Sequence, residues 1–348
     1  MRWPLLYLLL VSWVGLGLSA KGGEHWAFIA PHRHPPPTIK QTDWPKNAID
    51  HFILAELEDA NLQPSTEADK ITLLRRVYLD LIGLPPTPTE VKAFLADKRP
   101  DAYERIVDQL LASPRYGERW GRHWLDAARY ADSDGYSHDA PRIMWQYRDW
   151  VIRAINDDLP FDQFVIEQLA GDMLPDATAA QRIATGFHRN TQINTEGGVD
   201  REQFRIDSIF DRISTTGEVL FGLTFGCAQC HDHKYDPIKQ VEYYQMFAYY
   251  NQVDEPRHEI PTAADLNAQT AHDQKITALT TKVNNEEQGS DGRKKLEAEL
   301  AQLKKKRPRA TTALVMMQRS SPRMTHRFIQ GNFTRPAEEV KPGVPSIL

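Results

Sequence analysis

Residues 70–88 read KITLLRRVYLDLIGLPPTP, and this stretch shows the pattern on which the fold prediction rests. Its apolar side chains recur at helical intervals, at Leu73, Leu74, Val77, Tyr78 and Leu81. That spacing places them on one face of an α-helix. The pattern stops at GLPPTP, because glycine and proline both disfavour the continuation of a helix. We therefore expect an amphipathic helix that ends near Gly83.

The same period recurs over much of the chain. Further stretches of this kind open at Ala48, Thr89, Ala102, Arg115, Arg142, Phe161 and Ala179. The alternation of apolar and polar residues that is typical of half-buried strands is hard to find. The sequence therefore predicts a mainly α fold, an irregular multi-helix domain of about ten short helices over residues 46–258.

Residues 262–306 differ from the predicted helical domain because they are more polar. Apolar residues at helical spacing form two runs on either side of the breaker GSDG; they include Leu279, Val283, Leu296 and Leu300. This pattern predicts an inserted helical hairpin. The basic run KKKRPR that closes it is interpreted as a solvated helix end, because cations are favourable at the negative end of a helix.

Two short segments follow the hairpin, ALVMMQ at 313–318 and THRFIQGNF at 325–333, and both look like strands. The prediction for residues 310–348 is a short C-terminal tail that contains β-structure.

Composition and charge narrow the class of protein. Of the 348 residues, 41% are hydrophobic and 26% are charged, which is ordinary for a soluble globular protein. The formal net charge of -5 provides no global basic field. Nucleic acid and an anionic membrane surface are therefore not expected as partners.

The N-terminus has the pattern of an export signal. Arg2 precedes an apolar run at 5–18, and small residues follow. A basic start, an apolar centre and a small-residue cleavage zone are typical of a signal peptide, which we expect over residues 1–20. The apolar run is shorter than the roughly 20 residues of a membrane-spanning helix, so no stable span is expected. We expect an exported protein, periplasmic or extracellular, with a proline-rich arm at 21–45.

Both cysteines of the chain lie in the sequence CAQCH, as Cys227 and Cys230, and His231 follows directly. This C-x-x-C-H motif is typical of covalent haem attachment, in which two thiols add to the haem vinyl groups and the histidine becomes an axial iron ligand. Residues three apart on a helical turn share one face, so both sulfur atoms can reach one porphyrin edge. Haem c is the predicted cofactor, bound by Cys227, Cys230 and His231.

Three other interpretations of the cysteine-histidine cluster stay open. The cysteines could form a disulfide, act as a redox dithiol, or join His231 and His233 as zinc ligands. A redox dithiol usually follows a strand in an α/β setting, which this sequence lacks. Two histidines two apart point in nearly opposite directions on a helix, so zinc binding by both requires a non-helical loop.

His188 in GFHRN is the candidate for the second axial ligand of the haem iron. Imidazole ligates haem iron, and this histidine lies between a helical segment and a polar loop. A buried histidine with a purely structural role is the alternative. Met173 and Met246 could supply a thioether ligand instead, but both have the spacing of core residues.

Two glycine-containing loops carry acidic side chains. YADSDGY holds Asp132, and NTEGGVD holds Glu196 and Asp200. Carboxylates on such loops can act as general bases or bind calcium through oxygen. Calcium is not favoured, because DSDG lacks the distal glutamate of a calcium-binding loop. Glu196, Asp200 and Asp132 are therefore candidate catalytic residues of a polar substrate pocket.

Long stretches make the chain recognisable, among them WLDAARYADSDGY, FDQFVIEQLAGDMLP, ATGFHRNTQINTEGGVD and FRIDSIFDRISTTGEVLFGLTFGCAQCHDHKYDPI. It resembles a family of secreted planctomycete proteins with domain of unknown function 1549, which often carry an additional cytochrome c domain. The resemblance implies export and haem, with a redox partner protein or an attached cytochrome c domain as partner, and it supplies no substrate. Domain of unknown function 1553 normally follows, so residues 310–348 are expected to be the start of a truncated second domain.

Two classes of function follow from these patterns. The first is a redox protein that transfers electrons, or that oxidises an unknown substrate such as a polysaccharide or another carbohydrate-related molecule. The second is a binding or scaffolding module with a structural zinc ion or a disulfide at the cysteine-histidine cluster. The sequence contains no G-x-S-x-G, H-E-x-x-H or P-loop motif that would indicate a hydrolase. Haem content distinguishes the two classes.

Overall fold

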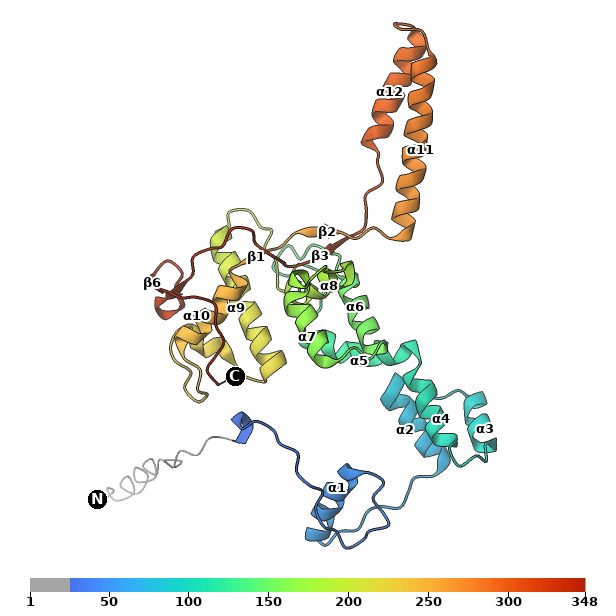
Figure 1. Cartoon of the computed structure of the whole chain (residues 1–348), viewed down its shortest axis with the longest axis vertical. Helices are drawn as coiled ribbons and strands as arrows, with labels where there is room; N and C mark the ends of the chain where they lie inside the picture. The colour runs from blue at the N-terminus through green and yellow to red at the C-terminus, as the bar shows by residue number, and fades with distance from the viewer. Residues whose placement is uncertain (1–25, 348) are drawn as a thin grey trace, which may run out of the picture. The chain divides into compact units, whose positions relative to one another are not determined.

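The computed structural model describes residues 26–347, and the expected signal peptide lies outside these residues. The chain forms two compact units. Of the described residues, 26–67 and Ile347 belong to the first unit, and Ala68–Ser346 form the second. Figure 1 shows the course of the chain through its helices and strands. Within the described residues, no helix is both long enough and apolar enough to cross a membrane.

The described part of the first unit contains the helix α1 (Ala48–Asp59) and the 3-10 turn η1 (Trp26–Phe28). Asn47 begins α1, because its side chain accepts hydrogen bonds from two backbone N–H groups of the first turn. The backbone N–H groups of Lys40 and Gln41 both donate to the carboxylate of Glu58, at 2.9 Å. The end of the proline-rich arm is thus fastened to α1 by polar contacts.

The second unit is mainly helical. Its helices before the predicted hairpin are α2 (Lys70–Ile82), α3 (Pro88–Ala96), α4 (Ala102–Leu111), α5 (Pro114–Ala127), α6 (Trp145–Asn156), α7 (Phe161–Ala170), α8 (Ala179–Ala184), α9 (Arg201–Thr216) and α10 (Gln240–Tyr250). Short 3-10 turns are η2 (Gly171–Met173), η3 (Thr185–Arg189) and η5 (Phe225–Gln229), and a π turn is η4 (Gly217–Phe221). The prediction of a mainly α fold is confirmed.

Helix α2 forms where the apolar period predicts it. The side chain of Asp69 caps its first turn, and Gly83 ends it with a left-handed backbone at φ 72°. Its buried face, which includes Leu74 and Tyr78, packs with Phe94 of α3 and with α4 in one apolar cluster. The amphipathic pattern of this stretch is therefore explained by a local helical core.

Helices α5 and α6 approach each other closely in a second apolar cluster. A Cβ atom at Gly117 of α5 would lie 2.3 Å from the carbonyl oxygen of Ile152 in α6, so only glycine fits at this crossing. Trp124, Trp150 and Phe164 pack their rings together beside it, with centroids 4.8 to 5.2 Å apart. A third cluster is built on α9 and α10.

The predicted hairpin is present as α11 (Ala263–Asn285) and α12 (Asp291–Lys305), which pack against each other (Figure 1). Paired strands close its base: β2 (Arg257–Glu259) pairs antiparallel with β3 (Thr312–Leu314), and β1 (Val253–Asp254) pairs antiparallel with β4 (Met317–Gln318). The chain therefore leaves and re-enters the second unit through one short two-stranded ribbon, as an insertion requires.

The C-terminal tail contains the expected short strands, and it packs into the helical unit. After β3 and β4 come β5 (His326–Phe328), the turn η6 (Ile329–Gly331) and β6 (Pro336–Glu339). Val315 belongs to the apolar cluster of α6 and α7, and Met316 and Phe328 belong to that of α9 and α10. The N–H of Met316 also donates to the hydroxyl of Thr185 at 2.9 Å. The segment expected to start a second domain thus completes two cores of this one.

An ionic triad of two buried arginines and one partly exposed carboxylate joins the clusters. Glu255 accepts from Arg212 of α9 at 2.6 Å and pairs with Arg189 of η3 at 3.2 Å, and both arginines are at least 95% buried. Arg189 also donates to the carbonyl of Val315, and Arg212 donates to that of His188. Burial disfavours the charged carboxylate, but the two guanidinium groups outweigh this and lower the pKa of Glu255. The triad therefore ties a helix, a turn and the tail together.

Glu255→Gln is expected to lower the free energy of unfolding by about 1–3 kcal/mol, because it leaves two buried guanidinium groups without their counter-charge, while solvent screens part of the attraction to a carboxylate that is 33% exposed. Urea denaturation followed by circular dichroism at pH 7 measures this. Glu297→Gln on α12 is the matched control, because that carboxylate pairs with Arg293 at an exposed site; a loss below about 1 kcal/mol is expected there.

The pH dependence supplies a second criterion. Since the pKa of Glu255 is lower in the folded state, its stabilisation is present above the unfolded value of 4.5 and is lost as the pH falls through the folded value. The difference between wild type and Glu255→Gln should therefore shrink on acidification. A difference that is no larger than the control's at pH 7 would contradict the role of the triad.

Candidate functional site

The CAQCH motif lies on the surface of the α9–α10 cluster. Phe225 and Ala228 of η5 are fully buried in that cluster and hold the turn in place. Cys227 and Cys230 are both exposed and free. The N–H of Cys230 donates to the carbonyl of Cys227 at 3.3 Å, which makes one 3-10 turn. Residues three apart are eclipsed in such a turn, so the two cysteines share one side, as the sequence predicts.

His231 presents one free ring nitrogen. Its Nδ1 lies 2.7 Å from the carbonyl oxygen of Asp232. A carbonyl only accepts, so Nδ1 carries the proton and Nε2 keeps its lone pair. Metal-bound histidines commonly have this arrangement, in which the second ring nitrogen donates to a carbonyl. Two exposed thiols and an imidazole with an available Nε2 are the groups that covalent haem attachment requires.

The segment after the motif is a loop, so the helical geometry assumed for His231 and His233 is wrong. The Nδ1 of His233 accepts hydrogen bonds from the N–H groups of Asp236 at 2.8 Å and Tyr235 at 3.2 Å. The N–H of His233 donates to the carbonyl of the buried Ile238. His233 therefore organises this loop, and its Nδ1 is already in use as an acceptor.

No cluster of metal ligands assembles around the motif. Within residues 26–347, no three His, Cys, Asp or Glu side chains are grouped so that they could hold a metal ion. The zinc alternative, with Cys227, Cys230, His231 and His233 around one ion, and the calcium alternative at the acidic loops therefore find no preformed site among these residues.

The C-terminal tail forms one wall of the motif. A Cβ atom at Gly331, which has a φ of 73°, would lie 3.0 Å from the sulfur of Cys230. The side-chain amide of Gln240 donates to the carbonyls of Gln229 and Phe328, and so links the motif to β5. The surroundings of Cys230 thus depend on residues about a hundred positions later in the chain.

His188, the candidate second iron ligand, is buried away from solvent. Its ring makes edge contacts with Phe187 and Tyr250, each at a centroid distance of 4.7 Å. Neither ring nitrogen has a hydrogen-bond partner. Burial, together with the charges of Arg212 and Arg129, lowers the pKa of His188 well below 6.5, so the ring is neutral. No hydrogen bond or ring contact joins it to the three motif residues in the described structure.

The two methionines differ in their environment. Met246 is buried in the α9–α10 cluster, as its spacing predicts. Met173 lies in η2 and is 62% exposed, so its assignment as a core residue is wrong. The turn η2 directs this side chain outward, because the helical period of α7 ends before it.

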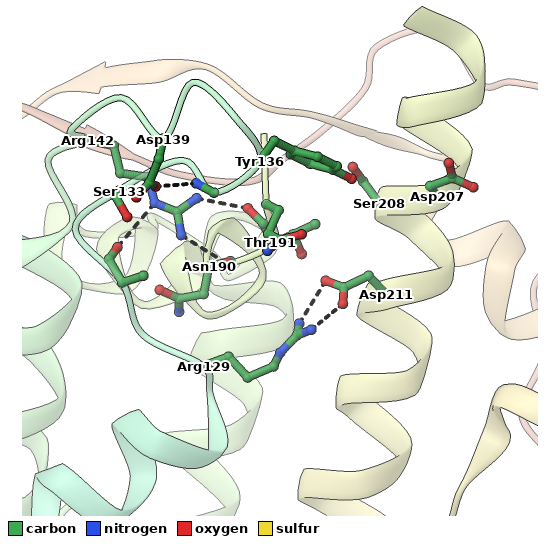
Figure 2. Close-up of a pocket in the computed structure, with 13 residues that line it drawn as sticks. Arg129, Ser133, Tyr136, Asp139, Arg142, Asn190, Thr191, Asp207, Ser208 and Asp211 are labelled. Carbon is green, nitrogen blue, oxygen red and sulfur yellow. Dashed lines mark hydrogen bonds and ion pairs between the residues drawn. The ribbon is translucent and has the colours of Figure 1, made fainter. Parts of the chain in front are cut away.

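A polar pocket of about 620 Å³ lies between the segment 129–142, residues 190–192 and helix α9. Figure 2 shows its labelled side chains, with Arg129 and Asp211 facing each other across it. The guanidinium of Arg129 binds both carboxylate oxygens of Asp211. The buried Arg142 donates to the carbonyls of Asn190, Thr191 and Ala131, at 2.8 to 3.2 Å. Arg142 therefore fastens the loop to the segment below it.

The three candidate catalytic carboxylates do not line this pocket. Asp200 caps α9 by accepting from the N–H groups of Glu202 and Gln203. Asp132 accepts from the hydroxyl of Tyr130 at 2.7 Å. Glu196 has a buried carboxylate oxygen without a partner. Of the two loops, YADSDGY supplies Ala131, Ser133, Gly135 and Tyr136 to the lining, whereas no residue of NTEGGVD lines the pocket.

Sequence reasoning missed the acidic side chains of the pocket, which are Asp139, Asp207 and Asp211. Asp207 and Asp211 are one helical turn apart on α9, and burial raises the pKa of Asp207. Their four-residue spacing in RIDSIFDR was a readable signal for a shared helix face. Nothing in the sequence indicated which loop would cover that face.

Helix α9 connects the pocket with the motif. It lines the pocket through Asp207, Ser208 and Asp211, and it packs against η5, which carries Cys227. The buried Tyr243 lies within electrostatic reach of both sites. Burial and then the charges of Tyr244, Cys230 and Asp211 raise its pKa well above 10, and its hydroxyl has no hydrogen-bond partner. The two sites therefore share one helix and one buried phenol.

A family model described as "Protein of unknown function (DUF1549)" matches residues 48–255. This range includes the motif, the pocket and helices α1 to α10. No curated protein and no solved structure matches the chain. The start of a domain of unknown function 1553 in the tail stays a prediction.

Gly331→Ala is expected to slow the reaction of Cys230 with a thiol reagent severalfold, because the added methyl group meets its sulfur at 3.0 Å. Measured on a Cys227→Ser background, the rate reports Cys230 alone. Gly289→Ala is the matched control: Gly289 has a φ of 88° and open space around its Cβ position. Both variants should lose about 1–2 kcal/mol from the left-handed backbone. Equal thiol rates in both would contradict the contact.

Proposed function

Because the chain belongs to the DUF1549 family, whose function is unknown, we propose its function from the chemistry of its own motif. The proposal is an exported redox protein with one covalently attached c-type haem. The observation that carries it is the surface turn with two free thiols on one side, followed by an imidazole whose Nε2 is available. Cys227 and Cys230 would hold the haem edge, and His231 would bind its iron.

The attachment needs no oxidant. Each thiol adds across one vinyl group, so that a carbon–sulfur bond forms and the thiol hydrogen passes to the other vinyl carbon. The two cysteines must therefore be reduced and accessible when the haem arrives, and exposed, unpaired thiols meet this requirement. When bound, the haem supplies one-electron redox chemistry.

The neighbouring residues would orient the iron ligand. The carbonyl of Asp232 holds Nδ1–H of His231, which fixes the tautomer and leaves Nε2 for iron. The carboxylate of Asp232 accepts from the N–H of Gln240 at 2.8 Å and so anchors this residue to the start of α10. His233 keeps the following loop closed. The loop would thereby limit rotation of the His231 ring.

Electron transfer to a protein partner is the role that the location of the motif supports. An exposed attachment site leaves the haem edge accessible to a redox partner protein or to an attached cytochrome c domain. The apolar run at 5–18 indicates export. Export is consistent with a c-type haem, because this haem has to be attached to the protein in a suitable compartment. Oxidation of a substrate is the enzymatic form of the same proposal.

The graded effects of motif variants test the proposal. The exported protein, made with a c-type maturation system, should retain haem after denaturation. Cys227→Ala and Cys230→Ala should each keep one thioether bond and show a shifted spectrum, and the double variant should lose covalent haem. His231→Ala should mainly change iron ligation. Haem per protein after denaturation, with the pyridine haemochrome spectrum, measures each effect.

His233→Ala is the control for this series. Because the ring of His233 serves the loop, its loss should lower the melting temperature and leave the covalent haem in place. Zinc per protein is measured in the same samples. Stoichiometric zinc that disappears with His233, and no haem in any variant, would overturn the proposal in favour of a structural zinc site.

The second axial ligand is a separate question, for which His188 is the proposed residue. Its two ring nitrogens lack partners, which is unusual for a buried histidine and leaves the unprotonated one free to bind. If His188 binds the iron, His188→Leu opens a position for carbon monoxide and changes the spin state, while covalent haem is kept. An unchanged spectrum would assign His188 to packing between Phe187 and Tyr250.

A further inference from the structure

We propose that the pocket between the segment 129–142, residues 190–192 and helix α9 binds a neutral carbohydrate. The proposal concerns side chains outside the CAQCH motif and does not depend on haem. The volume of the pocket, about 620 Å³, is in the range of small-ligand pockets in proteins.

The backbone around the pocket is held in unfavourable conformations. Arg129, Tyr136 and Asp139 have positive φ values of 57°, 58° and 31°, and all three line the pocket. Gly135, beside Tyr136, has a φ of 76°, and a Cβ there would lie 2.9 Å from the side chain of Gln192. Left-handed backbone in non-glycine residues is costly and concentrates at functional sites. The loop is thus kept in one shape over the pocket.

Two buried polar atoms of the pocket lack a partner. The Oδ1 of Asn190 and the hydroxyl of Thr191 form no hydrogen bond, although these residues are 96% and 95% buried. Figure 2 shows both residues between the loop and α9. Unpaired buried polar atoms are rare in proteins and point to a ligand that supplies the missing bonds. Asp207, which also lines the pocket, has no hydrogen-bond partner for its carboxylate in the described structure.

The unpaired groups identify the chemistry of the ligand. Carboxylate and amide oxygens only accept, and a threonine hydroxyl can accept as well, so the ligand must present several hydrogen-bond donors. The guanidinium groups of the pocket are already engaged: Arg142 binds three carbonyls, and Arg129 binds Asp211. An anion would therefore find no free cation here, and a molecule with several hydroxyl groups fits better.

The two guanidinium groups of the pocket work against a cationic ligand, although the lining has a formal charge of -1. The lining contains two arginines and three aspartates, and one arginine and one aspartate form a bidentate pair. A cationic ligand at Asp207 would lie in the same pocket as two guanidinium groups, of which Arg142 makes no bond to a carboxylate. Hydroxyl groups donate to the acceptors without this repulsion.

Tyr136 adds the apolar surface that a sugar ring needs. Its side chain extends from the loop toward Ser208 of α9 (Figure 2), and it is 41% exposed. Its ring is nearly perpendicular to that of Phe204, at a centroid distance of 5.4 Å, so Phe204 leaves at least one face of the Tyr136 ring uncovered. The C–H groups of a sugar ring pack on an aromatic face while its hydroxyls bond to the polar groups around it. The aromatic ring at the rim of the pocket and the polar groups on its floor together match the chemistry of a carbohydrate.

Saturation-transfer NMR on the full chain tests the proposal with glucose, xylose, cellobiose, maltose and lactose as neutral probes, and with glucosamine and glucuronate as charged ones. We expect transfer to at least one neutral probe. Thr191→Val and Asp207→Asn should weaken its binding at least tenfold, since each removes one acceptor. Asp108→Asn, at an exposed position of α4, is the matched control and should bind as wild type.

The outcomes separate the ligand classes. Transfer to glucosamine in preference to glucose would overturn neutrality, and transfer to none of the probes would overturn the proposal. Binding that survives both Thr191→Val and Asp207→Asn would place the sugar elsewhere and would also overturn it. Haem per protein is recorded for every variant, and an equal haem content in all of them shows that a loss of sugar binding is independent of the haem proposal.

Discussion

The carboxylate of Glu255 between Arg189 and Arg212 is the contact on which the second unit depends. Both arginines are nearly inaccessible to water, and a buried guanidinium group without a counter-charge is strongly unfavourable. The same two side chains reach the carbonyls of Val315 and His188. The turn η3, helix α9 and the C-terminal tail therefore have to lie next to one another. This arrangement also positions the residues of the two neighbouring apolar clusters.

Helix α9 connects the ionic triad with both functional sites. Its buried face holds Ile206, Ile209 and Ile213 in the core, and its other faces supply Asp207 and Asp211 to the pocket and a packing surface to η5. A rigid helix is a suitable support for two sites because its side chains keep fixed relative positions. The strained loop above the pocket depends on α9 as well, since Arg129 is held by Asp211.

The motif and the pocket have opposite physical characters. Cys227, Cys230 and His231 are exposed on a tight turn, with their reactive atoms free and their backbone fixed by buried neighbours. The pocket instead holds one bidentate ion pair, between Arg129 and Asp211, and several acceptors without a partner. The first arrangement suits covalent attachment and contact with a protein partner, and the second suits reversible binding of a small polar molecule. Tyr243 is buried, and the charges of Cys230 and Asp211 both contribute to raising its pKa.

The sequence by itself determined the features that depend on near neighbours in the chain. The apolar period at Leu73, Leu74 and Val77 predicts α2, the breaker GSDG predicts the hairpin, and CAQCH predicts a turn that puts two thiols on one side. Each depends on residues within a few positions, where spacing translates directly into geometry.

Only the tertiary structure decided which distant residues meet. It placed Gly331 against Cys230, Val315 against Arg189, and Asp207 rather than Asp132 in the pocket, and it made a loop where a helix around His233 was expected. Periodicity cannot report these contacts, because they come from the packing of separate helices and from the need to pair buried polar groups. That need brings together segments that are far apart in the chain.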